Sequence, residues 1–268
     1  VDKVKAMKDN YKWMKLDCLV TLGGNGTHKT ARMLSDEGLN IIGLPKTIDN
    51  DIWGTDVTFG FHTACNTATE VIDRLHTTAD SHGRVMVVEL MGNKAGWLTL
   101  QAGISGGADV VLIPEIPYDI DRVVKAVEAR KASRKNFSII AVAESAQTRE
   151  EAAQKRKDRQ PSDNPYRTVA HKVAEAVQQQ TGLEARAVVP GHIQRGGSPC
   201  AYDRVLATQF GAHAAELIRD EIYGVTVALS GNNIIHNKLS DVAGVAKPVP
   251  KDHNMVQTAR NIGLTFGD

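Results

Sequence analysis

Short apolar runs rich in β-branched residues recur along this chain, and each is bounded by glycine or polar residues. These runs have the length and composition of β-strands, at residues 16–22, 40–44, 85–90, 110–113, 137–143, 185–189 and 225–229. Between them lie stretches of helical pattern, most of them closed by glycine, at residues 28–37, 120–132, 166–180 and 202–223. The alternation of strand and helix predicts an α/β fold with mainly parallel, doubly wound sheets flanked by helices. The nearly continuous apolar character of the strands predicts burial on both faces.

One segment departs from this pattern. Residues 149–164 are charge-dense and interrupted by Pro161, which predicts an exposed insertion loop. A solvated insertion explains this composition better than a functional lid does.

Composition narrows the function classes. The chain has 268 residues, 42% of them apolar, enough for one large domain or two ordinary ones. Lys and Arg number 32 against 31 for Asp and Glu, so no overall charge attracts the chain to nucleic acid or to a membrane surface. No apolar run approaches the roughly 20 residues of a membrane span. Cys18, Cys65 and Cys200 are odd in number and far apart, which favours buried thiols in a reducing compartment. We therefore expect a cytoplasmic protein with no nucleic-acid or membrane partner.

A glycine loop, GGNGT at residues 23–27, lies directly between the first predicted strand and the first predicted helix. Open α/β sheets bind their ligands at such positions. Glycine lets the backbone approach phosphate, and the helix start adds unpaired N–H groups with a partial positive charge. We expect Thr27 to be the N-cap of the helix. A tight turn with a threonine cap and no ligand is the alternative, because the spacing matches neither a Walker loop nor a dinucleotide fingerprint.

A second polar cluster, KTIDND at residues 46–51, ends the next predicted strand. Neighbouring parallel strands end at the same edge of a sheet, so we expect this turn to lie beside the glycine loop. Asp49 and Asp51 can then have different roles, one accepting a proton and the other supporting a cation. With phosphate nearby, these groups suit phosphoryl transfer. A turn capped by two aspartates, without chemistry, is the alternative reading.

Four motifs in order along the chain resemble those of the 6-phosphofructokinases. The sequence PKTIDND at 45–51, followed by GTDVTFG at 54–60, is similar to the family's sugar-phosphate loop. VELMGNKAGW at 88–97 resembles its methionine-glycine turn, and GISGGAD at 103–109 with IPE at 113–115 its next helix and strand. GHIQRGGSP at 191–199, followed by AYDR at 201–204, resembles its most specific signature. Chance does not explain four ordered matches.

The resemblance implies transfer of a phosphoryl group from ATP to the 1-hydroxyl of fructose 6-phosphate, giving fructose 1,6-bisphosphate in glycolysis with the help of Mg²⁺. It assigns the general base to Asp49, the transferring phosphoryl oxygens to Thr47, and magnesium to Asp51 and Asn25. The residues that it assigns to the phosphoryl donor are Gly24, Asn25, Gly26, Thr27 and Lys46.

The resemblance also implies a site for the sugar phosphate. Besides Thr47 and Asp49, its predicted contacts are Met91, Gly92, Asn93 and Glu144 for the sugar, and His192 and Arg195 for the 6-phosphate. Arg84 and Arg186 are expected to join this pocket from a neighbouring subunit, so we expect a homo-oligomer, as a tetramer. Guanidinium groups suit phosphate because their planar fork can donate two parallel hydrogen bonds.

Family members are two-lobed, and the resemblance divides this chain in the same way. The predicted nucleotide lobe comprises residues 1–60 and 196–240, and the predicted sugar-phosphate lobe comprises residues 61–195 and 241–268. The family's opening strand, its glycine-rich phosphate turn and a stabilising arginine are expected to precede Val1. Because each such electrostatic group is typically worth about 10²- to 10³-fold in rate, residues 1–268 alone are expected to be weakly active or inactive.

Two residues depart from the family pattern. Asn25 stands where many relatives carry a magnesium-binding aspartate, and Asn93 stands where many bacterial relatives carry arginine. Asn25, together with the glycine-rich phosphate turn that is expected to precede Val1, supports a second hypothesis, a non-catalytic sugar-phosphate-binding subunit or fragment, while Asn93 leaves the sugar contact at its turn open. Lipid and NAD kinases share a glycine loop of this kind but lack the pocket motif at 192–197, so they rank far behind.

Two positions bear on whether the phosphoryl donor is ATP or pyrophosphate. Gly26 leaves room for the inner phosphates of ATP, where pyrophosphate users tend to carry aspartate; Lys46, however, resembles the pyrophosphate users. Steric exclusion is the firmer criterion, so ATP is favoured and pyrophosphate is the alternative. Lys135 matches a lysine of the bacterial effector pocket, whereas His76 replaces an arginine there, so regulation is not assumed to carry over.

Overall fold

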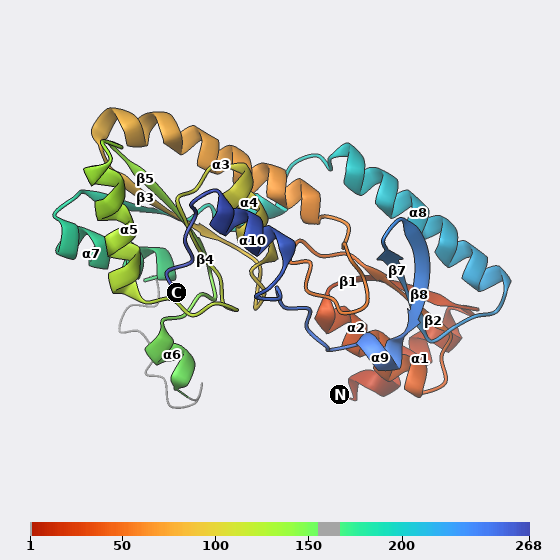
Figure 1. Ribbon diagram of the computed structural model, residues 1–268. Helices are drawn as coiled ribbons and strands as arrows, with labels where there is room; N and C mark the ends of the chain where they lie inside the picture. The colour runs from red at the N-terminus through yellow and green to blue at the C-terminus, as the bar shows by residue number, and fades with distance from the viewer. Residues whose placement is uncertain (1, 155–166) are drawn as a thin grey trace. The chain divides into compact units, whose positions relative to one another are not determined.

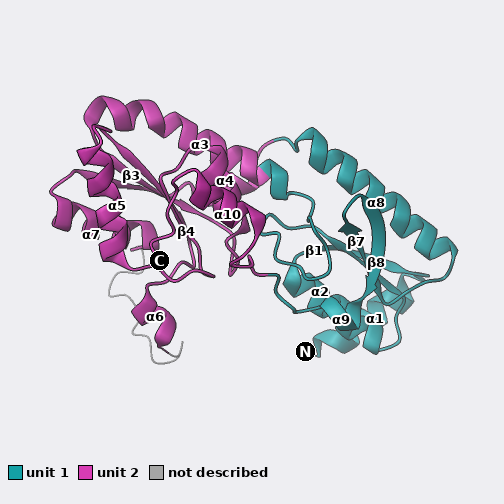
Figure 2. Ribbon diagram, viewed as in Figure 1, with its two compact units in different colours: residues 1–63, 198–247 teal, residues 64–197, 248–268 magenta. Residues whose placement is uncertain are grey.

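The computed structural model describes residues 2–154 and 167–268 (Figure 1). The chain forms two compact units, coloured separately in Figure 2. Unit 1 comprises Val1–Thr63 and Ser198–Lys247, and unit 2 comprises Ala64–Gly197 and Pro248–Asp268. Each unit has its own sheet and its own core.

Unit 1 is built on a sheet of strand order β1-β2-β7-β8. Its strands are β1 (Leu19–Gly23), β2 (Ile41–Pro45), β7 (Val225–Ser230) and β8 (Asn233–Lys238), all parallel except β8. Its helices are α1 (Lys3–Trp13), α2 (Asn25–Asp36), α8 (Ala201–Arg219) and α9 (Leu239–Val242). Successive strand residues point to opposite faces, so Ile42 packs against α8 through Phe210 while Ile41 packs with Ala31 of α2. The carboxyl ends of β1 and β2 therefore lie side by side on a sheet covered on both faces.

Unit 2 is built on an all-parallel sheet of strand order β4-β5-β3-β6. Its strands are β3 (Val85–Leu90), β4 (Val110–Leu112), β5 (Ser138–Ala143) and β6 (Ala185–Val188). Its helices are α4 (Trp97–Ser105), α5 (Ile120–Ala132), α6 (Arg149–Ala153), α7 (Val169–Thr181) and α10 (Asn254–Asn261), with most of α3 (Phe61–His82) and a 3₁₀ turn at Gly191–Arg195. Helices α5 and α7 pack on one face, where Val87, Val123 and Val173 share a core, and α4 packs against β4 and β5.

The predicted α/β fold with mainly parallel sheets is confirmed, and every predicted strand is present to within a few residues. The expectation that all of them are buried on both faces is wrong for β1 and β6, which lie at the edges of their sheets. Leu22 of β1, for example, is 55% exposed. Strand β8 was not predicted, because an antiparallel edge strand with one open face carries polar residues that weaken the apolar pattern.

Two local predictions need correction. Helix α2 begins at Asn25 with Gly24 as its N-cap, so Thr27 lies inside the first turn and is not the cap. Of the insertion predicted at 149–164, the first five residues form α6, because the Thr148 side chain and Glu151 cap each other's backbone. Residues 155–164 of that insertion lie outside the described residues, as does Tyr166 of the helix predicted at 166–180.

None of the three cysteines, all of which lie in the described part of the chain, forms a disulfide; Cys65 is buried, while Cys18 and Cys200 are only partly covered. Within the two described ranges, no helix is long and apolar enough to cross a bilayer.

Candidate active site

The glycine loop joins the carboxyl end of β1 to the start of α2 in unit 1. Gly24 takes the N-cap position with an extended backbone and, as a glycine, has no side chain with which to cap the first N–H groups of the helix. These donors and the positive end of the helix dipole suit an anionic group. A Cβ added at Gly26 would meet no atom within 4 Å, so the space beside the helix start is open.

The turn after β2 lies against this glycine loop. A Cβ added at Gly24 would lie 3.5 Å from the Cβ of Thr47. The Asn25 side-chain amide donates to the carbonyl of Asp51 at 3.0 Å. The ends of two adjacent parallel strands thus bring the residues expected to bind the donor and the expected catalytic residues into one part of unit 1.

The two carboxylates of the turn lie in different surroundings. Asp49 is half-buried, and its backbone N–H donates to Thr47 Oγ1 at 3.2 Å. Asp51 is 4% exposed. Between them Asn50 adopts a left-handed backbone with φ of 51°. Lys46 is exposed, and its backbone N–H donates to Gly23 O at 3.1 Å, which ties the two loops together.

The two residues expected to bind magnesium fit a cation of that kind. Asn25 Oδ1 is buried and accepts no hydrogen bond from the described residues, while the amide nitrogen of the same side chain is held by Asp51. Within residues 2–154 and 167–268, no three His, Cys, Asp or Glu side chains gather into a metal site. Magnesium does not need such a cage, because it takes one or two protein ligands and completes its shell with waters and substrate phosphates.

His28 supports the glycine loop from within the core and was not singled out from the sequence. Its ring is fully buried, with Nδ1 3.1 Å from Gly24 O and Nε2 2.9 Å from Thr226 Oγ1. Burial lowers the pKa of His28, so the ring is neutral near pH 7. The neighbouring strand makes room for it: a Cβ at Gly43 would lie 2.9 Å from Thr226 Oγ1 and 3.3 Å from His28 Nε2.

In unit 2, the predicted sugar-binding residues meet at the carboxyl ends of β3 and β5. Glu144, which directly follows β5, accepts hydrogen bonds from Gly92 N at 3.2 Å and Asn93 N at 2.7 Å. Gly92 has φ of 144°, and a Cβ there would lie 2.5 Å from Ala95 O, so only glycine fits this turn. Met91 N donates to Gln194 Oε1 at 3.1 Å.

Gln194 links this turn to the predicted phosphate-binding residues. Its side chain is 1% exposed and also donates to Gly191 O at 3.0 Å, which holds the 3₁₀ turn that follows β6. His192 and Arg195 stand on that turn with exposed side chains. Within unit 2, the carboxyl ends of three adjacent parallel strands therefore carry Glu144, Met91 and the 3₁₀ turn at one edge of the sheet.

Arg84 and Arg186 lie elsewhere in unit 2. Arg84 directly precedes β3 and Met91 directly follows it, so seven residue steps of about 3.3 Å separate them by roughly 20 Å. Both arginines pair with one carboxylate: Arg84 Nε lies 2.6 Å from Glu184 Oε2, and Arg186 bonds the other oxygen of Glu184. The hydrogen bond from Arg84, with support from Arg186, lowers the pKa of Glu184. Within one chain these arginines therefore do not join the residues around Met91.

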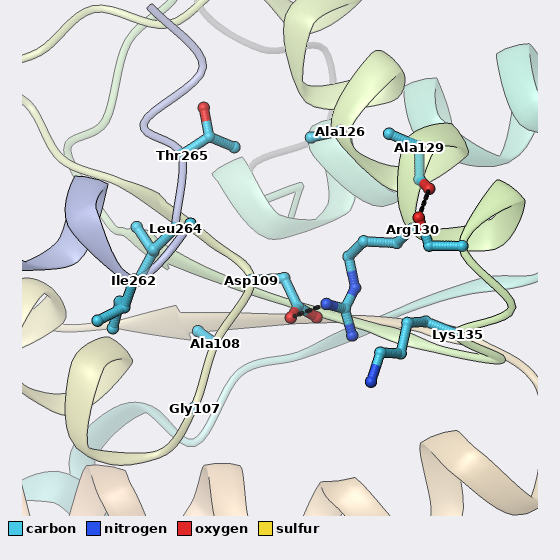
Figure 3. A pocket seen from close by; sticks show the side chains of 12 residues that line it. Gly107, Ala108, Asp109, Ala126, Ala129, Arg130, Lys135, Ile262, Leu264 and Thr265 are labelled. Atoms are coloured by element: carbon cyan, nitrogen blue, oxygen red, sulfur yellow. Dashed lines mark hydrogen bonds and ion pairs between the residues drawn. The ribbon is translucent and has the colours of Figure 1, made fainter.

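A cavity of about 530 Å³ opens between α5 and the segment 262–265 of unit 2 (Figure 3). Asp109 and Arg130 form an ion pair of 2.7 Å inside it, and Lys135 also lines it. His76 donates to the carbonyl of Gly106, next to the lining residues, at 2.6 Å. Burial raises the pKa of Asp109 although Arg130 lies beside it. The mixed charge of the cavity gives it no clear preference for an anion, and we assign it no effector.

Comparison with known proteins places the chain among related sequences. A family model described as Phosphofructokinase matches residues 1–218. The ATP-dependent 6-phosphofructokinase of Spirochaeta thermophila is 54% identical over 268 residues, covering 99% of this chain and 73% of the relative. ATP-dependent 6-phosphofructokinase 3 of Bacteroides thetaiotaomicron is 46% identical, covering 100% and 75%.

Solved structures are similar as well. Phosphofructokinase from Saccharomyces cerevisiae matches with a TM-score of 0.75 at 31% identity, covering 89% of this chain and 34% of that one. A pyrophosphate-dependent phosphofructokinase from Marinobacter aquaeolei matches with a TM-score of 0.80 at 20% identity, covering 97% of this chain and 70% of that one. The latter likeness concerns the fold alone.

Proposed function

This chain belongs to the phosphofructokinase family, and we propose that it transfers the terminal phosphoryl group of ATP to the 1-hydroxyl of fructose 6-phosphate. The products are ADP and fructose 1,6-bisphosphate, so the reaction is a step of glycolysis. The observation that carries this proposal is the contact of two strand-end loops in unit 1, where Gly24 approaches Thr47 and Asn25 bonds Asp51. One loop offers an anion site, and the other offers two carboxylates in different surroundings.

Asp49 acts as the general base. Its half-buried carboxylate accepts the proton of the sugar 1-hydroxyl while that oxygen attacks the terminal phosphorus and the bond to ADP breaks. The bond from Asp49 N to Thr47 Oγ1 fixes the turn, and it supports a role for Thr47 beside the transferring oxygens. The open N–H groups at the start of α2 bind the donor phosphates through Gly24, Gly26 and Thr27, with the exposed Lys46 beside them.

Magnesium would be held by Asp51 and by the buried amide oxygen of Asn25. When bound, it neutralises charge on the phosphates, which is the main electrostatic requirement of phosphoryl transfer. The hydrogen bond from the Asn25 amide to the backbone carbonyl of Asp51 orients the Asn25 side chain without the ion.

ATP is the donor. The relatives that are 54% and 46% identical are named ATP-dependent, and the open space beside Gly26 accommodates a nucleotide's inner phosphates. The pyrophosphate alternative has no comparable support, because the pyrophosphate-dependent structures are only 20% and 22% identical.

Unit 2 binds the sugar phosphate. The turn held by Glu144 presents Met91, Gly92 and Asn93, and the exposed His192 and Arg195 can reach a phosphate. A guanidinium group can donate two parallel hydrogen bonds to two oxygens of one phosphate, so Arg195 makes the main contact with the 6-phosphate.

The separation of Arg84 and Arg186 from Met91 supports a shared site. Because roughly 20 Å of strand lies between Arg84 and the turn of its own chain, these arginines would serve a neighbouring subunit. In the single chain described, the Glu184 carboxylate forms ion pairs with both arginines. The active form is then a homo-oligomer, as a tetramer, located in the cytoplasm.

A coupled assay with fructose 6-phosphate tests the proposal, with ATP and pyrophosphate supplied in turn to the purified full-length polypeptide. Turnover of about 1–100 per second with ATP and none with pyrophosphate is expected. Turnover below about a hundredth of that range with both donors, together with retained fructose 6-phosphate binding by calorimetry, would favour the non-catalytic binding subunit.

A further inference from the structure

A segment from the far end of unit 1 returns to the catalytic turn. Ala246 pairs with Ile52 in an antiparallel bridge, and the backbone N–H of Lys247 donates to Asp51 O at 2.9 Å. The same carbonyl accepts the Asn25 amide, so it joins the glycine loop, the turn and this segment. Nearly two hundred residues of chain separate Lys247 from the turn that it contacts.

The Lys247 side chain follows its backbone into the turn. Its ammonium donates to Asn50 Oδ1 at 3.2 Å, to Thr55 O at 2.8 Å and to Asp56 O at 2.8 Å. An ammonium group has three protons, and these three oxygens accept them. Lys247 therefore binds the protein rather than a ligand. Hydrogen bonds of this charged type are about twice as strong as neutral ones.

We call the three hydrogen bonds from the Lys247 ammonium the clamp. One of their acceptors, Asn50, links the two aspartates of the turn. Asn50 stands between Asp49 and Asp51, is 4% exposed and has φ of 51°. A left-handed backbone is uncommon for residues other than glycine; asparagine tolerates it better than most, and the hydrogen bonds to its side chain help to hold it here. Besides accepting from Lys247, Asn50 Oδ1 accepts from Thr58 N at 3.0 Å. If φ of Asn50 relaxed, the peptide planes on both sides would rotate and redirect Asp49.

We propose that Lys247 is a positioning residue for phosphoryl transfer: its ammonium locks Asn50 in the left-handed conformation that aims Asp49 at the sugar hydroxyl. This inference rests on the proposed function for its catalytic consequence. The clamp itself rests only on contacts inside unit 1. Lys247 touches no reacting atom in this account and acts through Asn50.

The test compares Lys247→Met, which removes all three donors, with Lys247→Gln, which keeps a shorter polar group. Lys251→Met is the matched control, since Lys251 is an exposed lysine four positions further along the chain. Lys247→Met should lower kcat about 10- to 100-fold, because a displacement of about 1 Å at a catalytic group can cost that much. KM for fructose 6-phosphate should stay within about threefold, since the predicted sugar-phosphate contacts other than Thr47 and Asp49 lie in unit 2. Lys247→Gln should lower kcat less, and it serves alone if the Met variant does not fold.

Hydrogen exchange of the free protein provides a readout that does not depend on turnover. Amides of residues 50–58 should exchange faster in Lys247→Met than in wild type and Lys251→Met, while amides of β3 should not change. A lysine that only adds global stability would speed exchange in β7 and β2 as well and would leave kcat of the folded protein unchanged, which would overturn the proposal. Unchanged exchange at 50–58 would overturn it too. Absence of turnover in wild type would instead remove the proposed function, and the exchange experiment would still decide whether the clamp exists.

Discussion

Gly26→Ala should stabilise the protein and weaken its use of ATP at the same time. Gly26 is the second residue of α2 and has no positive φ, and a Cβ there would meet nothing within 4 Å. Alanine therefore fits without strain, and replacing glycine within a helix gains about 0.5–1 kcal/mol. For 268 residues that unfold together, this gain corresponds to about 1–2 °C in Tm. The same methyl group would fill the space assigned to the inner phosphates of ATP.

The matched control is Gly211→Ala, since Gly211 also lies in a helix, α8, and its Cβ would likewise meet nothing within 4 Å. Both variants should show raised urea midpoints. Only Gly26→Ala should raise KM for ATP, by about tenfold, which corresponds to about 1.4 kcal/mol of lost binding. Gly26→Asp should penalise ATP more than pyrophosphate. If KM for ATP in Gly26→Ala matched that of Gly211→Ala, the space beside Gly26 would not be the donor site.

Three further outcomes follow from the described contacts. Arg195→Ala should raise KM for fructose 6-phosphate by about 10- to 100-fold with a smaller change in kcat, and a change in KM for ATP alone would mean that the phosphate pocket is misplaced. Mixing inactive Asp49→Asn and Arg186→Ala subunits should restore part of the activity, because a hybrid oligomer can form a site with both residues intact; no recovery after proven subunit exchange would contradict a shared site. His28 should make stability depend on pH: since burial lowers its pKa, the unfolded chain binds more protons below about pH 6.5, so stability is complete above that pH and declines as the pH falls. Urea unfolding from pH 7.5 to 5.5 should show that decline, and a slope unchanged by His28→Asn would assign it to other groups.

Much of the fold can be predicted from the sequence, because the apolar pattern that indicates a strand lies within a few consecutive residues. The runs at 85–90 and 137–143 became buried central strands of unit 2, since long apolar β-branched segments have few alternatives. The starts of helices are harder to predict from the sequence. Gly24 and Asn25 compete with Thr27 for the start of α2, and the pairing of β1 with β2 decides among them by fixing where the strand stops.

The residues that support the site through long-range contacts cannot be predicted from the sequence. His28 looks like an ordinary polar residue of an amphipathic helix, and its burial follows from a strand some 198 residues away. Gln194 has no local sign of its bond to Met91 N, 103 residues away. Lys247 is a single charged residue in a short apolar stretch that contains Pro248 and Pro250, and only the tertiary fold creates its contact with Asn50. In each case the partner lies far along the chain, so no periodic pattern records it.

Glu184 is a different kind of omission. It stands two positions before Arg186, and its pairing with that residue is local enough to anticipate. The pairing with Arg84 arises only because β3 and β6 are neighbours in the sheet, with Val85 opposite Ala185. One carboxylate holding two arginines therefore needs the strand order, which single-sequence patterns do not provide.

The most direct test of the account is the turnover of Asp49→Asn, an isosteric change that removes the proton acceptor and leaves the bond from its backbone N–H to Thr47 Oγ1 possible. Asp36→Asn, at the exposed end of α2, is the control. A fall in kcat of about 10²- to 10⁴-fold is predicted, with KM for ATP and fructose 6-phosphate within about threefold and Tm unchanged. A kcat within threefold of wild type in the folded variant would contradict phosphoryl transfer through Asp49.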